Sequence, residues 1–405
     1  MNIENKSKVV VLSCMGGSQG DLSVVRALGR CGVHVVVFSE YDTPIAKYSK
    51  YTKEFYKVPP FSQNYMVIRK YLVDYARKQD KKPVLFPTAD PDLKMISELR
   101  EELGKYFSLF ISSKEIIDGF MDKGKFFEYS NKYNFPVPYT KIPKNQDDVV
   151  AISEEIGFPV IMKPIFPHSW MNSNIQKIVE HKKAVKINDK NQLVDMYASI
   201  SKYNNEMVIQ EYVPGRDDHL YSLHIYMDRN KKPAGCFTGQ KIRTYPIYAG
   251  IGCFVKSVYV PQIISAGTEM LQKVGYTGLA LMQFKKDPRD DKFKLIEVNP
   301  RASSWNLLAA SCGVNLPYLA YLDAIGEPLS KINKQTENTK YVFFEHDLSA
   351  FLDYRKHGEL TIYSWLNSYR GKKVYQYFSL DDMGPFWRST RLLLGRYIAK
   401  ILRLK

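Results

Sequence analysis

The stretch Phe293-Lys-Leu-Ile-Glu-Val-Asn-Pro-Arg301 decides how the rest of the chain is interpreted. Side chains alternate between the two faces of an extended strand, so every second residue of the stretch is predicted to share one face. Glu297 and Asn299 then point the same way, about 7 Å apart, and carry the oxygen ligands that Mg²⁺ prefers. Pro300 ends the strand, and Arg301 offers a guanidinium to an anion. The same pattern also fits a surface strand whose polar residues face water.

The composition favours a multidomain cytoplasmic protein that binds anions. The 405 residues, 45% of them hydrophobic, are enough for two or three domains with their own cores. A formal net charge of +16 indicates anionic partners, such as nucleotide phosphates or an acidic membrane surface. No nucleic-acid-binding signature accompanies this charge, so nucleic acid is not predicted. The five cysteines form no Cys-x-x-Cys pair, which argues against a disulfide scaffold or a structural zinc site. No signal peptide or membrane-spanning run is found.

The chain opens with a β-α-β unit, which predicts an α/β fold. A strand at Val9–Cys14 leads through a glycine-rich turn at 16–21 into a helix at Leu22–Arg30, and a second strand follows at Val33–Phe38. Ser18 stands where a dinucleotide-binding turn needs its second glycine, so no nicotinamide site is predicted. The turn is expected to pack tightly or to hold a substrate anion at the helix N-terminus.

A second strand–helix unit is predicted at Val84–Phe86 and Asp92–Leu103. Asp90 follows this strand at the sheet edge where open α/β folds bind ligands. We therefore expect Asp90 either to bind a substrate amine or to cap the helix. Further along, strands are expected at Tyr221–Met227, Ala234–Lys241, Val255–Tyr259, Gly278–Lys285 and Phe293–Val298, and helices at Pro261–Val274, Trp305–Cys312 and Leu316–Ile325.

Four motifs occur in a fixed order: Lys123 at the start of a helix, Lys163 after an apolar strand, Gln210-Glu-Tyr-Val-Pro-Gly215, and Glu297–Arg301. In this order and spacing the chain resembles an ATP-grasp enzyme, most closely the predicted ATP-dependent carboxylate–amine ligases that include D-aspartate ligase-like proteins. The resemblance covers about 122–326.

The resemblance implies an α/β architecture in three parts. Residues 1–118 would form a Rossmann-like pre-ATP-grasp domain, and residues 119–328 an ATP-grasp domain of two subdomains with a hinge near 210–215. Residues 329–405 would form a C-terminal extension with a basic amphipathic helix.

The resemblance also implies ATP and Mg²⁺ as cofactors, and it assigns a nucleotide site. The matching residues are Lys123, Lys163, Gln210, Glu211, Tyr212, Val213, Asp217 and Asp218. The two lysines would contact phosphates, the backbone of the hinge would hold adenine, and Asp217 or Asp218 would accept from the ribose hydroxyls. A surface lysine at 123 and an ordinary strand and turn at 210–215 remain alternatives.

The metal ligands implied are Glu297, Asn299 and Gln283. Relatives carry a carboxylate where this chain has Gln283, so Glu297 would be the only clear anionic protein ligand. The predicted catalytic residues are Arg301, Lys241 and Arg243. Lys241 and Arg243 are expected to alternate onto one face and reach the same anion, although a solvated basic strand fits as well. Arg301 would stabilise charge on the transferred phosphoryl group or the tetrahedral adduct.

The loop at 165–182 departs from the family, because it lacks the glycines that usually cover the phosphates. Ser169, Ser173 or Asn174 would take over that role. His168 is either a catalytic base or an incidental loop residue.

The segment 387–405 is basic, without any acidic residue, and Leu394 shares one helical side with Tyr397, Ile398 and Ile401. This pattern is typical of a helix on an anionic membrane. A helix docked on the protein body with a wet basic face fits equally well. The localisation predicted is cytoplasmic, with peripheral membrane contact and a homodimer left open.

The function predicted is an ATP-dependent carboxylate–amine ligase that forms an amide through an acyl phosphate, on an amino acid or cell-envelope precursor. A small-molecule kinase of the same fold and a non-catalytic nucleotide-binding module are the alternatives, since fold alone does not separate them.

Overall fold

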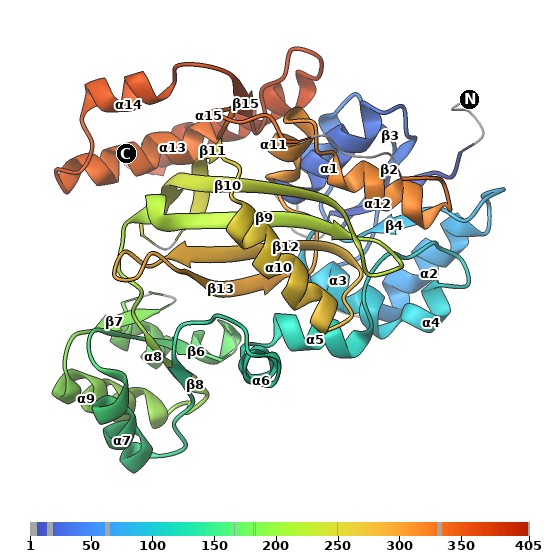
Figure 1. Ribbon diagram of the computed structural model, residues 1–405. Coiled ribbons are helices and arrows are strands. Elements are labelled where there is room, and N and C mark those ends of the chain that lie inside the picture. The colour runs from blue at the N-terminus through green and yellow to red at the C-terminus, as the bar shows by residue number, and fades with distance from the viewer. Residues whose placement is uncertain are drawn as a thin grey trace.

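Three β-sheets organise the chain in the computed structural model (Figure 1). The structure describes residues 6–13, 19–60, 65–165, 167–180, 182, 184–248, 250–329 and 334–403, without the side chains of residues 19, 123, 167, 168 and 396–403. In this part of the chain, the four-stranded sheets follow the orders β3-β2-β1-β4 and β5-β8-β6-β7, and the seven-stranded sheet follows β13-β12-β9-β10-β11-β14-β15.

The first sheet confirms the predicted β-α-β opening. All of its strand pairs are parallel, as expected of strands that are joined by helices. Its strands are β1 (Val9–Ser13), β2 (Val35–Ser39), β3 (Thr52–Lys57) and β4 (Val84–Phe86), and its helices are α1 (Gln19–Gly29), η2 (Ile45–Tyr48), α2 (Tyr65–Ala76), α3 (Asp90–Glu98) and α4 (Arg100–Leu103). The valine-rich strands β1 and β2 are buried along their whole length, which explains why they read as continuous apolar runs.

The small antiparallel sheet has a separate core. Its elements are β5 (Thr140–Lys141), α7 (Gln146–Ile156), β6 (Val160–Pro164), η3 (Pro167–Trp170), α8 (Ser173–Ile178), β7 (Val185–Ile187), α9 (Lys190–Ser201) and β8 (Met207–Glu211). Buried residues from these strands and helices form one hydrophobic cluster. Helices α5 (Lys114–Met121) and α6 (Lys123–Tyr133) precede this sheet.

The large sheet runs through the middle of the molecule and carries most of the predicted site (Figure 1). Its strands are β9 (Leu220–Met227), β10 (Pro233–Tyr245), β11 (Ile251–Ser257), β12 (Gly278–Lys286), β13 (Phe293–Asn299), β14 (Lys340–Val342) and β15 (Lys373–Tyr375). The helices in this part are η4 (Asp217–His219), α10 (Pro261–Lys273), α11 (Asn306–Ser311), α12 (Leu316–Ala324), α13 (Phe344–Lys356), α14 (Ile362–Ser368) and α15 (Gly384–Arg403).

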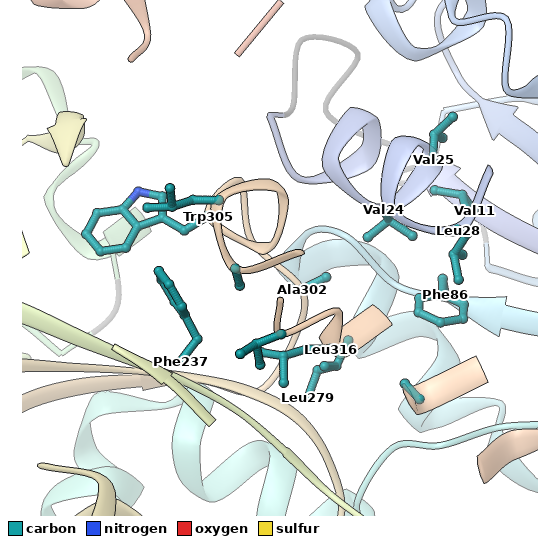
Figure 2. Close-up of a cluster of buried hydrophobic side chains, with 14 of the residues drawn as sticks. Val11, Val24, Val25, Leu28, Phe86, Phe237, Leu279, Ala302, Trp305 and Leu316 are labelled. Atoms are coloured by element: carbon teal, nitrogen blue, oxygen red, sulfur yellow. The ribbon is translucent and has the colours of Figure 1, made fainter. Parts of the chain in front are cut away.

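Two hydrophobic clusters cover the large sheet. One joins β9 and β12 to α10. The other joins the sheet, through α11 and α12, to α1 and the first parallel sheet. Figure 2 shows part of this second cluster, with Phe237, Leu279 and Trp305 on one side and Val11, Val24 and Phe86 on the other. The first sheet and the large sheet therefore share a core.

The predicted alternation along β13 is wrong at one point, because a β-bulge interrupts it. Glu297 pairs with Gln283 and Leu295 pairs with the next residue, Phe284, which leaves Ile296 without a partner. Such a bulge reverses the order of the faces. Leu295 is therefore buried in the cluster beneath α10, while Glu297 and Asn299 share the opposite face.

The C-terminal segment is built into the rest of the fold. Its strands β14 and β15 extend the large sheet. Beyond them, Asp382 forms a salt bridge at 2.8 Å with Arg26 of α1, and both side chains are almost completely buried. Asp382 also accepts hydrogen bonds from Ser49 Oγ at 2.7 Å and from the backbone N–H of Lys50 at 2.8 Å. A buried ion pair of this kind fixes the segment against α1 and the first sheet.

Among the described residues, no helix has the length and apolar character needed to span a bilayer.

Candidate active site

Polar side chains from three strands meet on one face of the large sheet. Glu297 Oε1 accepts hydrogen bonds from the Gln283 amide and, at 3.0 Å, from Asn299 Nδ2. Gln283 Oε1 accepts from Lys241 Nζ at 2.8 Å. Lys241 lies on β10 and reaches across β9 to do so. The predicted metal ligands and one predicted catalytic lysine are thus brought together.

Lys241 is a buried cation beside a neutral amide. Its side chain is only 7% exposed, and burial lowers the pKa of its ammonium below the ordinary lysine value, against the opposing charge of Glu297. The ring of Trp305 lies over Gly252, where a Cβ would come within 2.6 Å of the ring and 3.4 Å of Lys241 Cγ. The glycine therefore lets the indole cover the lysine stem.

Arg243 does not face the same way, so the predicted pairing with Lys241 is wrong. The register shifts between the two residues: Lys241 pairs with Val255, and Arg243 pairs with the preceding residue, Phe254. Consecutive residues of a strand point to opposite faces. Arg243 is 4% exposed and forms a salt bridge with Asp347 at 2.6 Å. It serves the fold.

Arg301, just after β13 of the large sheet, contacts the helix that follows the first sheet. Its guanidinium hydrogen-bonds Asp90 at the start of α3. Burial alone would lower the pKa of Arg301, but the Asp90 carboxylate raises it above the usual value. The helix-capping interpretation of Asp90 is wrong, since Ala89 is the cap residue and Asp92 accepts from its backbone N–H at 2.8 Å.

Two buried carboxyl groups lie at the same edge of the first sheet. Asp92 also accepts from the N–H of Thr88, and Asp21 accepts from Ser13 Oγ at the end of β1. Burial raises the pKa of both aspartates to about 7. The glycine turn before Asp21 was predicted to pack tightly or hold an anion, but residues 14–18 lie outside the described part of the chain.

The predicted hinge residues contact both the small and the large sheet. Lys163 Nζ donates to Gln210 Oε1 at 2.9 Å within the small sheet. Glu211 accepts two hydrogen bonds of 2.9 Å from Lys294 of β13 and pairs with Arg289. Burial raises the pKa of Glu211, but these two cations bring it below the usual value. Glu211 thus connects the end of β8 to the β12–β13 hairpin.

Tyr212 lies between two lysines from different sheets. Its ring centroid is 4.4 Å from Lys186 Nζ of β7 and 5.4 Å from Lys285 Nζ of β12. Lys285 is two residues from Gln283 and therefore shares its face. Burial lowers the pKa of Lys285. The buried Lys241 and the half-buried Lys285 thus line the same polar face.

Comparisons with known proteins show which families the chain resembles. A family model described as ATP-grasp in the biosynthetic pathway with Ter operon matches residues 254–346. The chain is 26% identical over 297 residues to D-aspartate ligase of Enterococcus faecium, across 69% of this chain and 68% of that protein. It is 26% identical over 211 residues to the arginine-specific large chain of carbamoyl phosphate synthase from Geobacillus stearothermophilus, across 52% of this chain and 20% of that one.

A solved structure with this fold is the biotin carboxylase domain of Hydrogenobacter thermophilus 2-oxoglutarate carboxylase, in complex with MgADP and bicarbonate. The TM-score is 0.61 at 16% identity, over 83% of this chain and 73% of that one. The chain is similar to ATP-grasp enzymes in sequence and in fold. The resemblance to ATP-grasp enzymes and the α/β fold class, both predicted from the sequence, are confirmed. The predicted enzyme class, an ATP-dependent ligase that forms C–N bonds, is confirmed as well.

Within this ATP-grasp fold, Asp217 does not take the predicted ribose role. It is 4% exposed, and its Oδ2 accepts from Thr244 Oγ1 at 2.5 Å, from the Tyr248 N–H at 3.1 Å and from the Tyr354 hydroxyl. Through these three hydrogen bonds, the Asp217 carboxylate fixes the loop after β10. Asp218 is exposed and remains the ribose candidate. Val213 is buried, and the binding of adenine by its backbone stays a prediction.

The glycine-free loop after β6 forms η3 and α8. Ser169 was predicted to cover the phosphates, but it is buried and donates to Glu206 at 2.9 Å. Ser173 and Asn174 are exposed at the start of α8. Lys123 is the first residue of α6, behind its cap Asp122. The side chains of Lys123 and His168, for which roles were predicted, lie outside the described residues.

Sequence reasoning missed four cations of this site. These are Lys186, Lys285, Arg289 and Lys294. A signal exists for one of them: Lys285 follows Gln283 at the two-residue spacing of a strand. The others become visible only when the small sheet folds against the β12–β13 hairpin.

Proposed function

We propose that the chain joins a carboxylate to an amine through an acyl phosphate, at the expense of ATP. The observation that carries this proposal is the buried Lys241 ammonium. The ammonium donates a hydrogen bond to the neutral amide of Gln283. The nearby Glu297 carboxylate already accepts hydrogen bonds from two amides, those of Gln283 and Asn299. A desolvated cation that lacks a matched anion favours binding of a polyanion. The terminal phosphates of ATP supply that charge.

The sheet contacts support a nucleotide site that is shared by the small and large sheets. Lys163 approaches from β6, Lys285 from β12 and Lys241 from β10. Point cations from different elements can fix a phosphate chain in one position. The hinge backbone around Val213 would hold adenine, and Asp218 the ribose.

The donor set fits magnesium that takes most of its ligands from phosphates and water. Within the described residues, no group of three or more His, Cys, Asp or Glu side chains converges on one point. Glu297 supplies one carboxylate, and Gln283 and Asn299 lie beside it with amide oxygens. Mg²⁺ is commonly held by one or two carboxylates plus substrate phosphates. Bound there, the ion would neutralise phosphate charge and polarise the bond to the transferred group.

The reaction needs no side-chain nucleophile. A substrate carboxylate oxygen bonds to the γ-phosphorus of ATP and ADP leaves, which converts a poor electrophile into an acyl phosphate. An amine then attacks the carbonyl carbon, loses a proton and expels phosphate. Lys241 would balance charge on the transferred phosphoryl group, and Arg301, oriented by Asp90, would stabilise the negative oxygen of the adduct.

Amino acids are the first substrates to test, because the curated relative is named D-aspartate ligase. Phosphate release from Mg-ATP is measured with single amino acids and with pairs, and hydroxylamine is added to trap an acyl phosphate. A ligase releases phosphate in full only when acid and amine are both present. Phosphate retained on a single acceptor would instead identify the kinase alternative.

Two substitutions connect that activity to the site. Glu297→Gln is expected to lower kcat by about 10²–10³, the usual effect of losing one electrostatic group from an active site. Lys286→Met, on the same strand as Gln283 but beyond the site, serves as the control and is expected to keep wild-type turnover. If neither the wild type nor the control releases phosphate in any pair although both bind Mg-ATP, the chain is a non-catalytic module.

A further inference from the structure

The C-terminal helices expose a row of large apolar side chains. On α13, Phe344, Leu348 and Leu352 are 50%, 38% and 48% exposed. Their spacing of four residues places them on one helical side. Burying three such side chains is normally a main source of stability, so a helix that leaves them half exposed has a side without a partner among the side chains that the structure describes.

Neighbouring helices flank this row on both sides. Asp347 and Phe351 lie to one side of it and contact Trp365 of α14, by a hydrogen bond of 2.8 Å and by ring stacking at 4.6 Å. Glu345 lies to the other side and accepts from Ser389 of α15 at 2.6 Å. At 3.6 residues per turn the row falls between these contacts. The apolar side of α13 therefore lies exposed between α14 and α15.

The two flanking helices also turn apolar side chains outward. Helix α14 has no buried residue, and its Tyr363 and Leu366 are 75% and 58% exposed. On α15, Trp387 and Leu394 are 56% and 57% exposed. In Figure 1 the three helices lie together at the top of the view, with the small sheet at the bottom.

Helix α15 is docked, and its docking face is not the apolar one. Arg388 donates to Thr43 Oγ1 at 2.6 Å and lies over the ring of Tyr48. Ser389, on the same side, is 5% exposed. The polar side of the helix thus attaches it to Thr43 and η2 through Arg388 and to α13 through Ser389, and Trp387 and Leu394 are left to face outward.

The fully exposed charges around the apolar row are positive, whereas the carboxylates there are only partly exposed. Arg391 is exposed between Trp387 and Leu394, and Arg355 is exposed one turn beyond the row on α13. Neither arginine forms an ion pair with a residue that the structure describes. Glu345 is engaged by Ser389, and Asp353 lies 3.6 Å from Lys356. A two-fold contact with a second copy would bring these unpaired arginines together.

We infer that α13, α14 and the first turns of α15 form a docking surface for an anionic lipid bilayer. Aromatic and aliphatic side chains would enter the headgroup region, while Arg355 and Arg391 remain at the level of the lipid phosphates. The surface is separate from the ligase site and does not depend on the proposed reaction. Extended by α13 and α14, it is broader than the α15 segment predicted from the sequence.

The test is flotation of the full chain with vesicles of phosphatidylcholine, alone or mixed with phosphatidylglycerol. Binding is expected only to the anionic vesicles and is expected to weaken with salt. Arg391→Glu should lower the partition coefficient about thirtyfold, because reversal removes an attraction and adds a repulsion. The double change Leu348→Ser with Trp387→Ser should lower it about a hundredfold.

Matched controls lie at the far end of the molecule. Tyr203 is 49% exposed after α9, and its neighbour Lys202 is also exposed, so Tyr203→Ser with Lys202→Glu changes a similar surface without touching the docking face. Equal binding by the control and the docking-surface variants would overturn the inference. So would absence of binding to both vesicle types, or a dimer in light scattering that Leu348→Ser converts to monomer.

Discussion

Two buried cations lie two residues apart on β10, and replacing each by methionine should have opposite effects. Lys241 is 7% exposed and donates to the neutral Gln283 amide. Arg243 is 4% exposed and is paired with the Asp347 carboxylate. Methionine is close in length to both side chains and carries no charge. The comparison therefore separates a cation kept for a ligand from a cation kept for the fold.

The expected magnitudes follow from the partners left behind. Lys241→Met removes a desolvated charge and leaves only an amide oxygen short of one donor, about 1 kcal/mol. Relief of the desolvation offsets this loss, so stability should change by no more than about 1 kcal/mol in either direction. Arg243→Met leaves Asp347 buried with an uncompensated charge, which costs about 3–5 kcal/mol. Because Trp365 and Tyr369 still donate to Asp347 at 2.8 and 2.6 Å, we expect the lower end of that range.

Thermal unfolding and calorimetric titration measure both effects. At about 2 °C per kcal/mol, Arg243→Met should lower the melting temperature by about 6 °C or more, and Lys241→Met by no more than about 2 °C. For Mg-ATP the order is reversed: Lys241→Met should weaken binding about tenfold to a hundredfold, the value of a charge-assisted hydrogen bond. Arg243→Met, assayed below its melting point, should bind normally.

The reasoning would be refuted by a Lys241→Met protein that unfolds as easily as the Arg243→Met protein. Lys241 would then stabilise the fold, and the shortage of negative charge around it would not indicate a ligand. Unchanged Mg-ATP affinity in the Lys241→Met protein would refute it as well.

Three further outcomes are expected. Asp382→Asn should destabilise the chain by about 3–5 kcal/mol in urea unfolding, because Arg26 loses its counter-charge in a fully buried position; a loss below 1 kcal/mol would contradict this. His224, whose pKa burial lowers from 6.5 to about 3, binds a proton in the unfolded chain before it does so in the fold, so stability should decrease as pH falls through that window. His224→Phe, which keeps the stacking on Trp305, should remove about 2 kcal/mol of the stability lost between pH 6.5 and 5. The affinity for Mg-ATP should decrease as the pH rises, because Lys241 loses its proton at a pH below the ordinary lysine pKa of 10.5. Calorimetry in buffers of rising pH tests this. In the Lys241→Met protein, the affinity should no longer depend on pH in this range.

The sequence predicted the positions of strands and helices well, for a simple physical reason. Runs such as Val84–Phe86 are buried on both faces and carry no polar residue, so they coincide with β4 at both ends. The boundaries of α6 were equally readable, since Asp122 caps its start and Asn134 ends it with φ 52°. The residues at the ends of these strands and helices determine their boundaries locally, so the boundaries do not depend on tertiary contacts.

The candidate site was predictable only in part. The Gln283–Glu297–Asn299 cluster followed from strand spacing and family resemblance, and the structure brings these three side chains together. Tertiary contacts decided the remainder. Asp217 has the same charge and nearly the same position as Asp218, yet it is buried under three donors while its neighbour is exposed. No local pattern distinguishes two adjacent aspartates in that way.

Two predictions about which side chains share a face of a strand were wrong, one on β13 and one on β10, and a β-bulge is the cause in both. Each bulge has a physical reason. Without the unpaired Ile296, Leu295 would share a face with Glu297. Either a carboxylate would then enter the core beneath α10, at a cost of several kcal/mol, or a leucine would leave it, at about 2 kcal/mol.

On β10 a regular strand would likewise place Lys241 and Arg243 side by side, two buried cations with one carboxylate between them. The register shift gives Arg243 its own anion in Asp347 and leaves Lys241 on the face of Glu297. In each strand, one extra residue separates a requirement of the fold from a requirement of the site. Alternation rules therefore fail where the chain passes from core to site, and they fail in the direction that keeps charge out of the core.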